Sequence, residues 1–279
     1  MELHEIRISG LSRSSEIELV PIGDIHIGTI NCDLNELERV VEYVYKHDNC
    51  YWQGMGDYEE CIKHQDSRRF DPRTVPERHL ARLGDIAQSQ KEELVSILEP
   101  ILNPDKCWGL HGGNHEEDLF KYYGEDIVNQ ICSTYGLRNL GYKALTRLMF
   151  SRSTRGGTAT FVIHSQHGHG GGRKVGSKIN LLRDLPANID ADVHIMGHIH
   201  DRVMDDAVQL KLSPAGRKLK LKAREMVFGI TGTFYRTYQE GNTNYAEKRD
   251  YPPTPMGCIK ITFAPWSSRS KLHIEKLRT

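Results

Sequence analysis

Five short segments rich in Gly, His and Asp or Asn occur within the first 200 residues. They are Gly23–Gly28 (GDIHIG), Gly54–Asp57 (GMGD), Gly112–Glu116 (GGNHE), His167–Gly171 (HGHGG) and Gly197–His200 (GHIH). Their side chains supply imidazole, carboxylate and one amide oxygen, with no thiolate at these positions. That donor set suits Mn, Fe, Zn or Ni and argues against a structural zinc site built on cysteines.

The candidate ligands in these segments are too many for one tetrahedral ion. They are Asp24, His26, Asp57, Asn114, His167, His198 and His200, with His115 beside Asn114. Two ions that share a bridging carboxylate would use this set fully. Two metals about 3.5–4 Å apart form the usual clamp for in-line displacement at phosphorus. The sequence therefore predicts a phosphoesterase with two divalent metal ions.

Each of these segments follows a predicted strand. The strands are expected at Ile17–Ile22, Cys50–Met55, Cys107–Leu110, Thr158–His164 and Val193–Met196. In open α/β sheets, sites form beyond the carboxyl ends of the strands. A two-residue step in Asp24-x-His26 and His198-x-His200 favours one side for both side chains. The glycines allow sharp turns close to an ion.

Helices are expected between these strands. Asp33–His47 has helical apolar spacing, and Pro76–Leu98, Glu116–Tyr135 and Lys178–Leu185 are also expected to be helical. The last third is predicted to be mostly β, with a hairpin from Val208–Leu212 to Leu219–Phe228 around the turn residues 213–216, followed by Gly229–Phe234 and Gly257–Phe263.

Taken in order, the five segments resemble the motifs of the calcineurin-like metallophosphoesterase superfamily. The superfamily includes Ser/Thr protein phosphatases, purple acid phosphatases, cyclic-nucleotide phosphodiesterases and SbcD-type nucleases. The segments HGHGGGRKVGSKIN and NYAEKRDYPPTPMG also look similar to calcineurin-like proteins of bacteriophages and prophages. The resemblance implies an α/β fold of two β-sheets in a sandwich flanked by helices, in α-β-β-α layers.

The resemblance also implies a role for each residue. Asp24, His26 and His200 would hold the first metal; Asn114, His167 and His198 would hold the second; Asp57 would bridge both. His115 would steady the phosphate and protonate the leaving group. The implied mechanism is direct hydrolysis by a hydroxide that bridges the ions. The fourth-loop ligand is chosen from His164, His167 and His169, and His167 is preferred because it precedes a glycine after the strand.

The substrate is expected to be a phosphodiester, with nucleic acid or a nucleotide favoured. Protein phosphatases of the superfamily read GDxVDRG from the glycine before the bridging Asp onward, whereas here Asp57 is followed by Tyr58-Glu59-Glu60. A phosphomonoesterase is the alternative, and a non-catalytic scaffold is less favoured because every ligand position is filled. Arg69, His169 and Lys174 are candidate phosphate contacts.

The basic run at 218–222 alternates Lys with Leu. It predicts a strand with one basic and one buried face, which is either a lysine-protected edge or a nucleic-acid contact.

Composition bounds the rest of the prediction. The 279 residues have 37 basic and 37 acidic side chains, so net charge gives no argument for nonspecific binding to nucleic acid or membranes. No apolar run approaches the roughly 20 residues that span a bilayer. The six cysteines are scattered singly, which favours reduced thiols and a cytoplasmic location. We expect one metallophosphoesterase domain over 1–279, with a helical insertion over 66–100 and a β-rich part over 205–279 that completes the sandwich.

Overall fold

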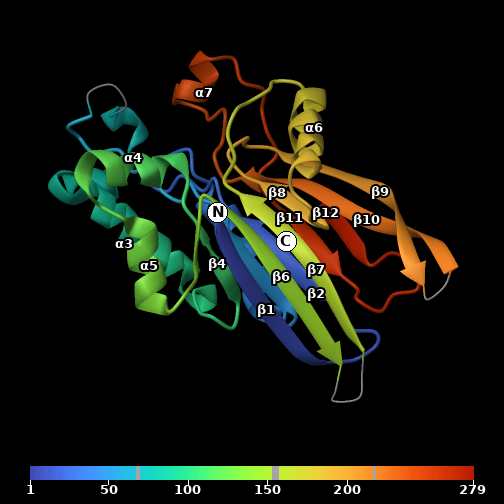
Figure 1. Ribbon diagram of the computed structural model, residues 1–279. Coiled ribbons are helices and arrows are strands. Elements are labelled where there is room, and N and C mark those ends of the chain that lie inside the picture. The colour runs from blue at the N-terminus through green and yellow to red at the C-terminus, as the bar shows by residue number, and fades with distance from the viewer. Residues whose placement is uncertain (67–69, 153–156, 216–217) are drawn as a thin grey trace.

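The computed structural model describes residues 1–66, 70–152, 157–215 and 218–279. Figure 1 shows two layers of strands at the centre, with α3, α4 and α5 on one side and α6 on the other. Among the described residues, no helix combines the length and the apolar character needed to cross a membrane.

The strands form two sheets that join where the end of one strand, β10, meets β11. The first sheet has the order β1 (Glu2–Leu11), β6 (Lys143–Arg152), β7 (Thr158–Gln166), β8 (Val193–Met196), β10 (Lys218–Thr233) and β9 (Arg202–Ala215). The second has the order β12 (Leu272–Lys276), β11 (Gly257–Phe263), β2 (Ile17–Ile22), β3 (Cys50–Gly54), β4 (Cys107–His111) and β5 (Asn139–Gly141). β10 and β11 pair only at Gly232–Cys258 and Thr233–Gly257.

The inner faces of the two sheets pack against each other. Phe150 and Phe161 of the first sheet meet Phe263 of the second, with ring centroids 5.8 and 5.3 Å from it. The same buried cluster includes residues from β1, β2, β7, β8 and β11. This aromatic and aliphatic layer is the core of a β-sandwich.

Helices cover the outer faces of both sheets. The helices in the described residues are α1 (Leu34–Lys46), α2 (Glu77–Leu80), α3 (Ile86–Leu98), α4 (Asn114–Tyr123), α5 (Ile127–Tyr135), α6 (Val175–Asp184) and α7 (Tyr245–Lys248). α1, α3 and α5 pack on β2, β3 and β4 in one buried cluster, and α6 packs through Leu182 on β8 and β10 in another. The fold is therefore mixed α/β with two sheets flanked by helices, as the sequence predicted.

The directions of the strands bring the polar loops together. β2, β3 and β4 are parallel neighbours, as are β7, β8 and β10. Consequently the loops after β2, β3, β4, β7 and β8 gather at one end of the sandwich, where parallel strands expose their carboxyl ends.

Two predicted helices are interrupted. The expected helix Pro76–Leu98 is α2, a 3₁₀ turn at Leu83–Asp85 and then α3. The expected helix Glu116–Tyr135 ends at Gly124, whose φ of +73° terminates α4, and α5 begins three residues later. Glycine reaches this left-handed backbone without steric cost, so it ends the helix despite apolar residues beyond it.

The predicted C-terminal hairpin is longer than expected, and one of its faces was assigned wrongly. β9 and β10 pair from Arg202–Thr231 to Ala215–Lys218, and the expected segment Gly229–Phe234 is the end of β10, which stops at Thr233, instead of a separate strand. Leu219 and Leu221 were expected on a buried face, but they are 70% and 69% exposed.

Candidate metal centre

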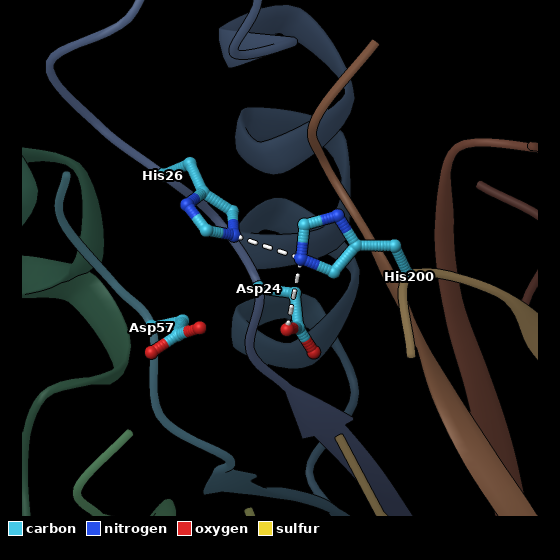
Figure 2. Close-up of side chains that lie close together, drawn as sticks. All are labelled: Asp24, His26, Asp57 and His200. Carbon is cyan, nitrogen blue, oxygen red and sulfur yellow. Dashed lines mark hydrogen bonds and ion pairs between the residues drawn. The ribbon is translucent and has the colours of Figure 1, made fainter. Parts of the chain in front are cut away.

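Two groups of metal-ligating side chains lie side by side and share Asp57. Ligand atoms of Asp24, His26, Asp57 and His200 lie within 4.8 Å of one another, and those of Asp57, His167 and His198 form a second such group. Figure 2 shows the first group, in which His26 and His200 approach each other above Asp24 while Asp57 faces them. One shared carboxylate between two clusters is the arrangement expected for a pair of metal ions.

The loop after β2 is fixed by contacts with two other loops and with the end of β10. The amide of Asp24 donates to the Gly56 carbonyl at 2.9 Å, and its own carbonyl accepts from Thr233 Oγ1 at 2.9 Å. The Asp24 carboxylate accepts from the His198 backbone amide at 2.9–3.0 Å. Asp24 is thereby held rigidly beside the loop that carries His198 and His200.

The backbone at the site adopts an unusual conformation. Asp24, His26, Asp57, His198 and His200 all have positive φ, between 49° and 66°. This left-handed region is uncommon for residues other than glycine, and such strain concentrates at functional sites. The conformation turns the side chains of closely spaced residues toward one centre.

Two glycines allow the loop after β3 to approach the loop after β4. A Cβ atom on Gly56 would lie 2.6 Å from the Gly113 amide nitrogen, and one on Gly113 would overlap the carboxylate and amide of Asp57. Gly56 also has a φ of +88°. Close backbone contact at this point places Asp57 between the two ligand groups.

Glu116 holds these two loops together, a role that the sequence analysis missed. Its buried carboxylate accepts backbone amides of Asp57 at 3.0 Å, Tyr58 at 2.7 Å and Gly113 at 2.8 Å. A Glu three residues after the helix N-cap is a known signal for such a contact. No local sequence pattern predicts the contact between Glu116 and the Asp57 loop, because the two residues are 59 positions apart.

Of the three histidines in the fourth loop region, the structure brings His167 to this centre. His167 Nδ1 donates to the Met55 carbonyl at 2.7 Å, which directs Nε2 to within 3.3 Å of Asp57 Oδ2. Ligating histidines characteristically donate the other ring nitrogen in this way. His164 instead pairs with His194, Nδ1 to Nδ1 at 3.2 Å, and His169 is exposed.

The Asn114 amide lies between the members of the second group. One terminal atom of this amide is 3.1 Å from His167 Nε2, 2.8 Å from His198 Nδ1 and 3.2 Å from Asp57 Oδ2. With nitrogen there, the amide donates hydrogen bonds. With oxygen there, four donor atoms converge on one point, as ligands of a divalent cation do.

His115 lies beside the shared carboxylate. Its Nδ1 donates to the Glu60 carbonyl at 2.9 Å, and its Nε2 is 4.0 Å from Asp57 Oδ2. The Glu60 carboxylate approaches His26 Nδ1 at 3.3 Å. Glu60 was not selected from the sequence, yet it contacts both the His26 and the His115 rings.

The site electrostatically favours positive charge at its centre. Burial opposes ionisation of Asp57, but the His115 and His167 rings outweigh burial and hold its pKa well below the usual value. Burial alone would lower the pKa of His167, yet Asp57 raises it to about 10. Burial lowers the pKa of His26 and His198, which favours the neutral imidazole that binds metals. The buried donors therefore fit divalent cations.

The predicted phosphate contacts are not part of the two ligand groups. Arg69 lies outside the described residues. His169 and Lys174 are exposed, and Lys174 precedes α6 as its N-cap. Tyr235, which was not predicted at the site, packs against His26 and His200 with ring centroids 5.4 and 5.9 Å apart.

Comparison with known proteins gives little further information. No protein-family model and no curated protein matches the chain. The chain is similar to a solved structure of a conserved uncharacterized protein from Streptococcus pneumoniae TIGR4, described as a predicted phosphoesterase. The match covers 89% of this chain and 82% of that protein's chain. The TM-score is 0.33 and the sequence identity is 13%, a likeness too weak to carry an argument about activity.

Proposed function

We propose that the protein hydrolyses phosphate esters with two divalent metal ions. The observation that carries this proposal is that two ligand groups share Asp57. The resemblance of the five sequence segments to the calcineurin-like superfamily supports the same function, with Mn as the first choice of metal.

Asp24, His26 and His200 would hold one ion, Asn114, His167 and His198 the other, and Asp57 both. When bound, such ions supply Lewis-acid stabilisation of phosphate oxygens and lower the pKa of a nearby water. The protein fixes the ligand geometry in advance, because the hydrogen bonds of Asp24 and Glu116 set the loops before substrate arrives.

His115 is proposed as the general acid. Its Nδ1 hydrogen bond to the Glu60 carbonyl fixes the ring, so the Nε2 edge faces the centre beside Asp57. A proton on Nε2 would be delivered to the leaving oxygen.

The preferred substrate class is a phosphodiester, in nucleic acid or a nucleotide. Protein phosphatases of the superfamily have Asp-Arg at the positions occupied here by Glu60-Cys61. Cys61 is buried and cannot replace a guanidinium that binds phosphate bidentately. This departure supports a substrate other than a phosphoprotein.

The test is a panel of substrates assayed with added Mn²⁺. It contains bis-p-nitrophenyl phosphate, p-nitrophenyl phosphate, and single- and double-stranded DNA. We expect the diesters to be hydrolysed faster, and Asp57→Asn to lose bound metal and all hydrolysis together. A preference for the monoester over every diester would make the protein a phosphomonoesterase. Absence of both metal binding and hydrolysis in the wild type would leave a scaffold role.

A further inference from the structure

The outer part of the β9–β10 hairpin extends beyond the rest of the first sheet (Figure 1). β8 pairs with β10 only from Val227 to Ile230. Among the described residues, the outer part of β10 pairs with β9 alone. The base is anchored, because Arg224 Nε donates to Asp192 at 2.6 Å and Glu225 accepts from the Lys271 amide at 2.9 Å. Beyond this base the hairpin is a two-stranded arm.

One face of the arm is apolar. We call it the leucine face, and it comprises Val208, Leu210, Leu212, Leu219 and Leu221. The register places Leu212 opposite Leu221, and residues directly opposite each other project to the same side of a sheet. Alternation carries Val208 and Leu210 to that side from β9, and Leu219 from β10.

The opposite face of the arm is basic. Lys211 and Lys222 are cross-strand partners one residue removed from Leu212 and Leu221, and Lys220 follows the same alternation. Lys211 lies 3.5 Å from Asp190, which also pairs with Arg224. By alternation, the basic face continues the outer side of the first sheet, where Phe228 packs with α6. The leucine face continues the inner side, where Val227 meets the second sheet, but it lies beyond the part that the second sheet covers.

The leucine face is unusually exposed for a protein surface. Its five side chains are between 60% and 70% exposed. Contiguous apolar patches of more than a few hundred Å² are rare on monomers, and larger ones mark interaction sites. Single exposed leucines need no explanation, but five on one face of a protruding ribbon do.

We propose that the leucine face binds the same face of a second copy of this chain. The five side chains are uncharged, so the face is complementary to itself, as a two-fold contact requires. The formal net charge of the chain is zero, so two copies do not repel each other at long range. Two such ribbons would pack face to face as two sheets do.

A second copy would place the leucine face at the centre of the contact. A standard interface buries about 800 Å² on each side, and apolar residues concentrate at its centre. The leucine face would supply that apolar centre, and the flanking arm and sheet would supply the rim. A lipid bilayer is disfavoured, because the lysines lie on the face opposite the leucines and would point away from anionic headgroups.

The test measures the mass of the full chain in solution. Sedimentation equilibrium from low to high micromolar concentration should give twice the monomer mass of 31.9 kDa. The double variant Leu212→Ser/Leu221→Ser should raise the dimer dissociation constant at least about tenfold. The matched control Lys211→Ser/Lys222→Ser changes the adjacent pair on the opposite face and should remain dimeric.

Three results would overturn the proposal. They are a wild type that stays monomeric, a dimer that the leucine variant leaves intact, and a monomer that instead co-sediments with anionic vesicles. Circular dichroism will verify folding of each variant, and we expect native spectra because the substituted side chains are already exposed.

Cross-linking supplies a second readout that does not depend on weakening the contact. The six native cysteines are all buried, so an introduced surface thiol is the reactive one. Oxidised Leu212→Cys should form a covalent dimer on a non-reducing gel, whereas Lys211→Cys should not. Equal cross-linking of both variants would contradict the proposed face.

Discussion

The Nε2 atoms of His26 and His200 lie 3.0 Å apart, although 174 residues separate them in the chain. His200 Nε2 is also 3.3 Å from Asp24 Oδ1. Two imidazole nitrogens and a carboxylate oxygen therefore point to the same small volume (Figure 2). A single cation bound at this point could be coordinated by all three atoms.

The first prediction concerns His200→Ala. Loss of one imidazole from the first ligand group should lower the metal content from about two ions per chain towards one. Elemental analysis after gel filtration measures the stoichiometry. His273→Ala is the control, because that histidine is exposed on β12. An unchanged metal content in His200→Ala would remove His200 from the ligand set.

The second prediction separates acid catalysis from metal binding. His115→Ala should keep its metal but lose turnover by about 10²–10⁴-fold, the usual contribution of a general acid. The loss should be larger for DNA than for bis-p-nitrophenyl phosphate, because nitrophenolate leaves readily without a proton.

The metal content and both turnover rates of His115→Ala are measured beside those of His273→Ala. Equal losses for the two leaving groups would argue against proton donation and favour a role in positioning phosphate.

The third prediction uses two neighbouring glycines. Gly113→Ala would drive a methyl group into the Asp57 carboxylate and amide, so it should weaken metal binding and reduce hydrolysis. Gly112→Ala is the matched control, since a Cβ there has its nearest neighbour at 3.9 Å. Titration with metal, monitored by calorimetry, compares the metal affinities of the two variants. Similar affinities would show that the close loop contact is dispensable.

The fourth prediction is a loss of stability in acid caused by two buried histidines outside the metal centre. Burial lowers the pKa of both His164 and His194 to about 4, against 6.5 for the unfolded chain. Below pH 6.5 both histidines become protonated in the unfolded chain, whereas in the folded chain they stay neutral until the pH approaches 4. The contribution of these two neutral histidines to the free energy of unfolding is therefore fully present above pH 6.5 and is lost as the pH falls towards 4.

At pH 5 the loss should be about 2 kcal/mol for each histidine, at roughly 1.4 kcal/mol per pKa unit. Urea unfolding of the chelator-treated protein at pH 7 and pH 5 measures it. The double variant His164→Leu/His194→Leu should flatten this dependence, and His273→Leu should not. A double variant with the wild-type pH dependence would show that these two rings do not control it.

The sequence by itself determined the types of donor and the strands that carry them. β2, β8 and β11 have the predicted bounds. β2 and β8 are short apolar runs that end at a glycine, a pattern that specifies buried strands locally. The rule that sites form beyond the carboxyl ends of strands then led to the expectation that the loops meet. The broken helices show the limit of this reasoning, since periodicity continues across Gly124 while the backbone does not.

Only the tertiary structure decided which side chains meet. His167 faces Asp57 because the Met55 carbonyl, in the loop after β3, accepts a hydrogen bond from its Nδ1, and nothing near His164 or His169 in the sequence encodes that contact. Glu116 joins two loops for the same reason. Alternation placed Leu219 and Leu221 on the face opposite the lysines, but the prediction that this face is buried was wrong. Burial depends on elements distant in the chain, and here the leucines remain exposed.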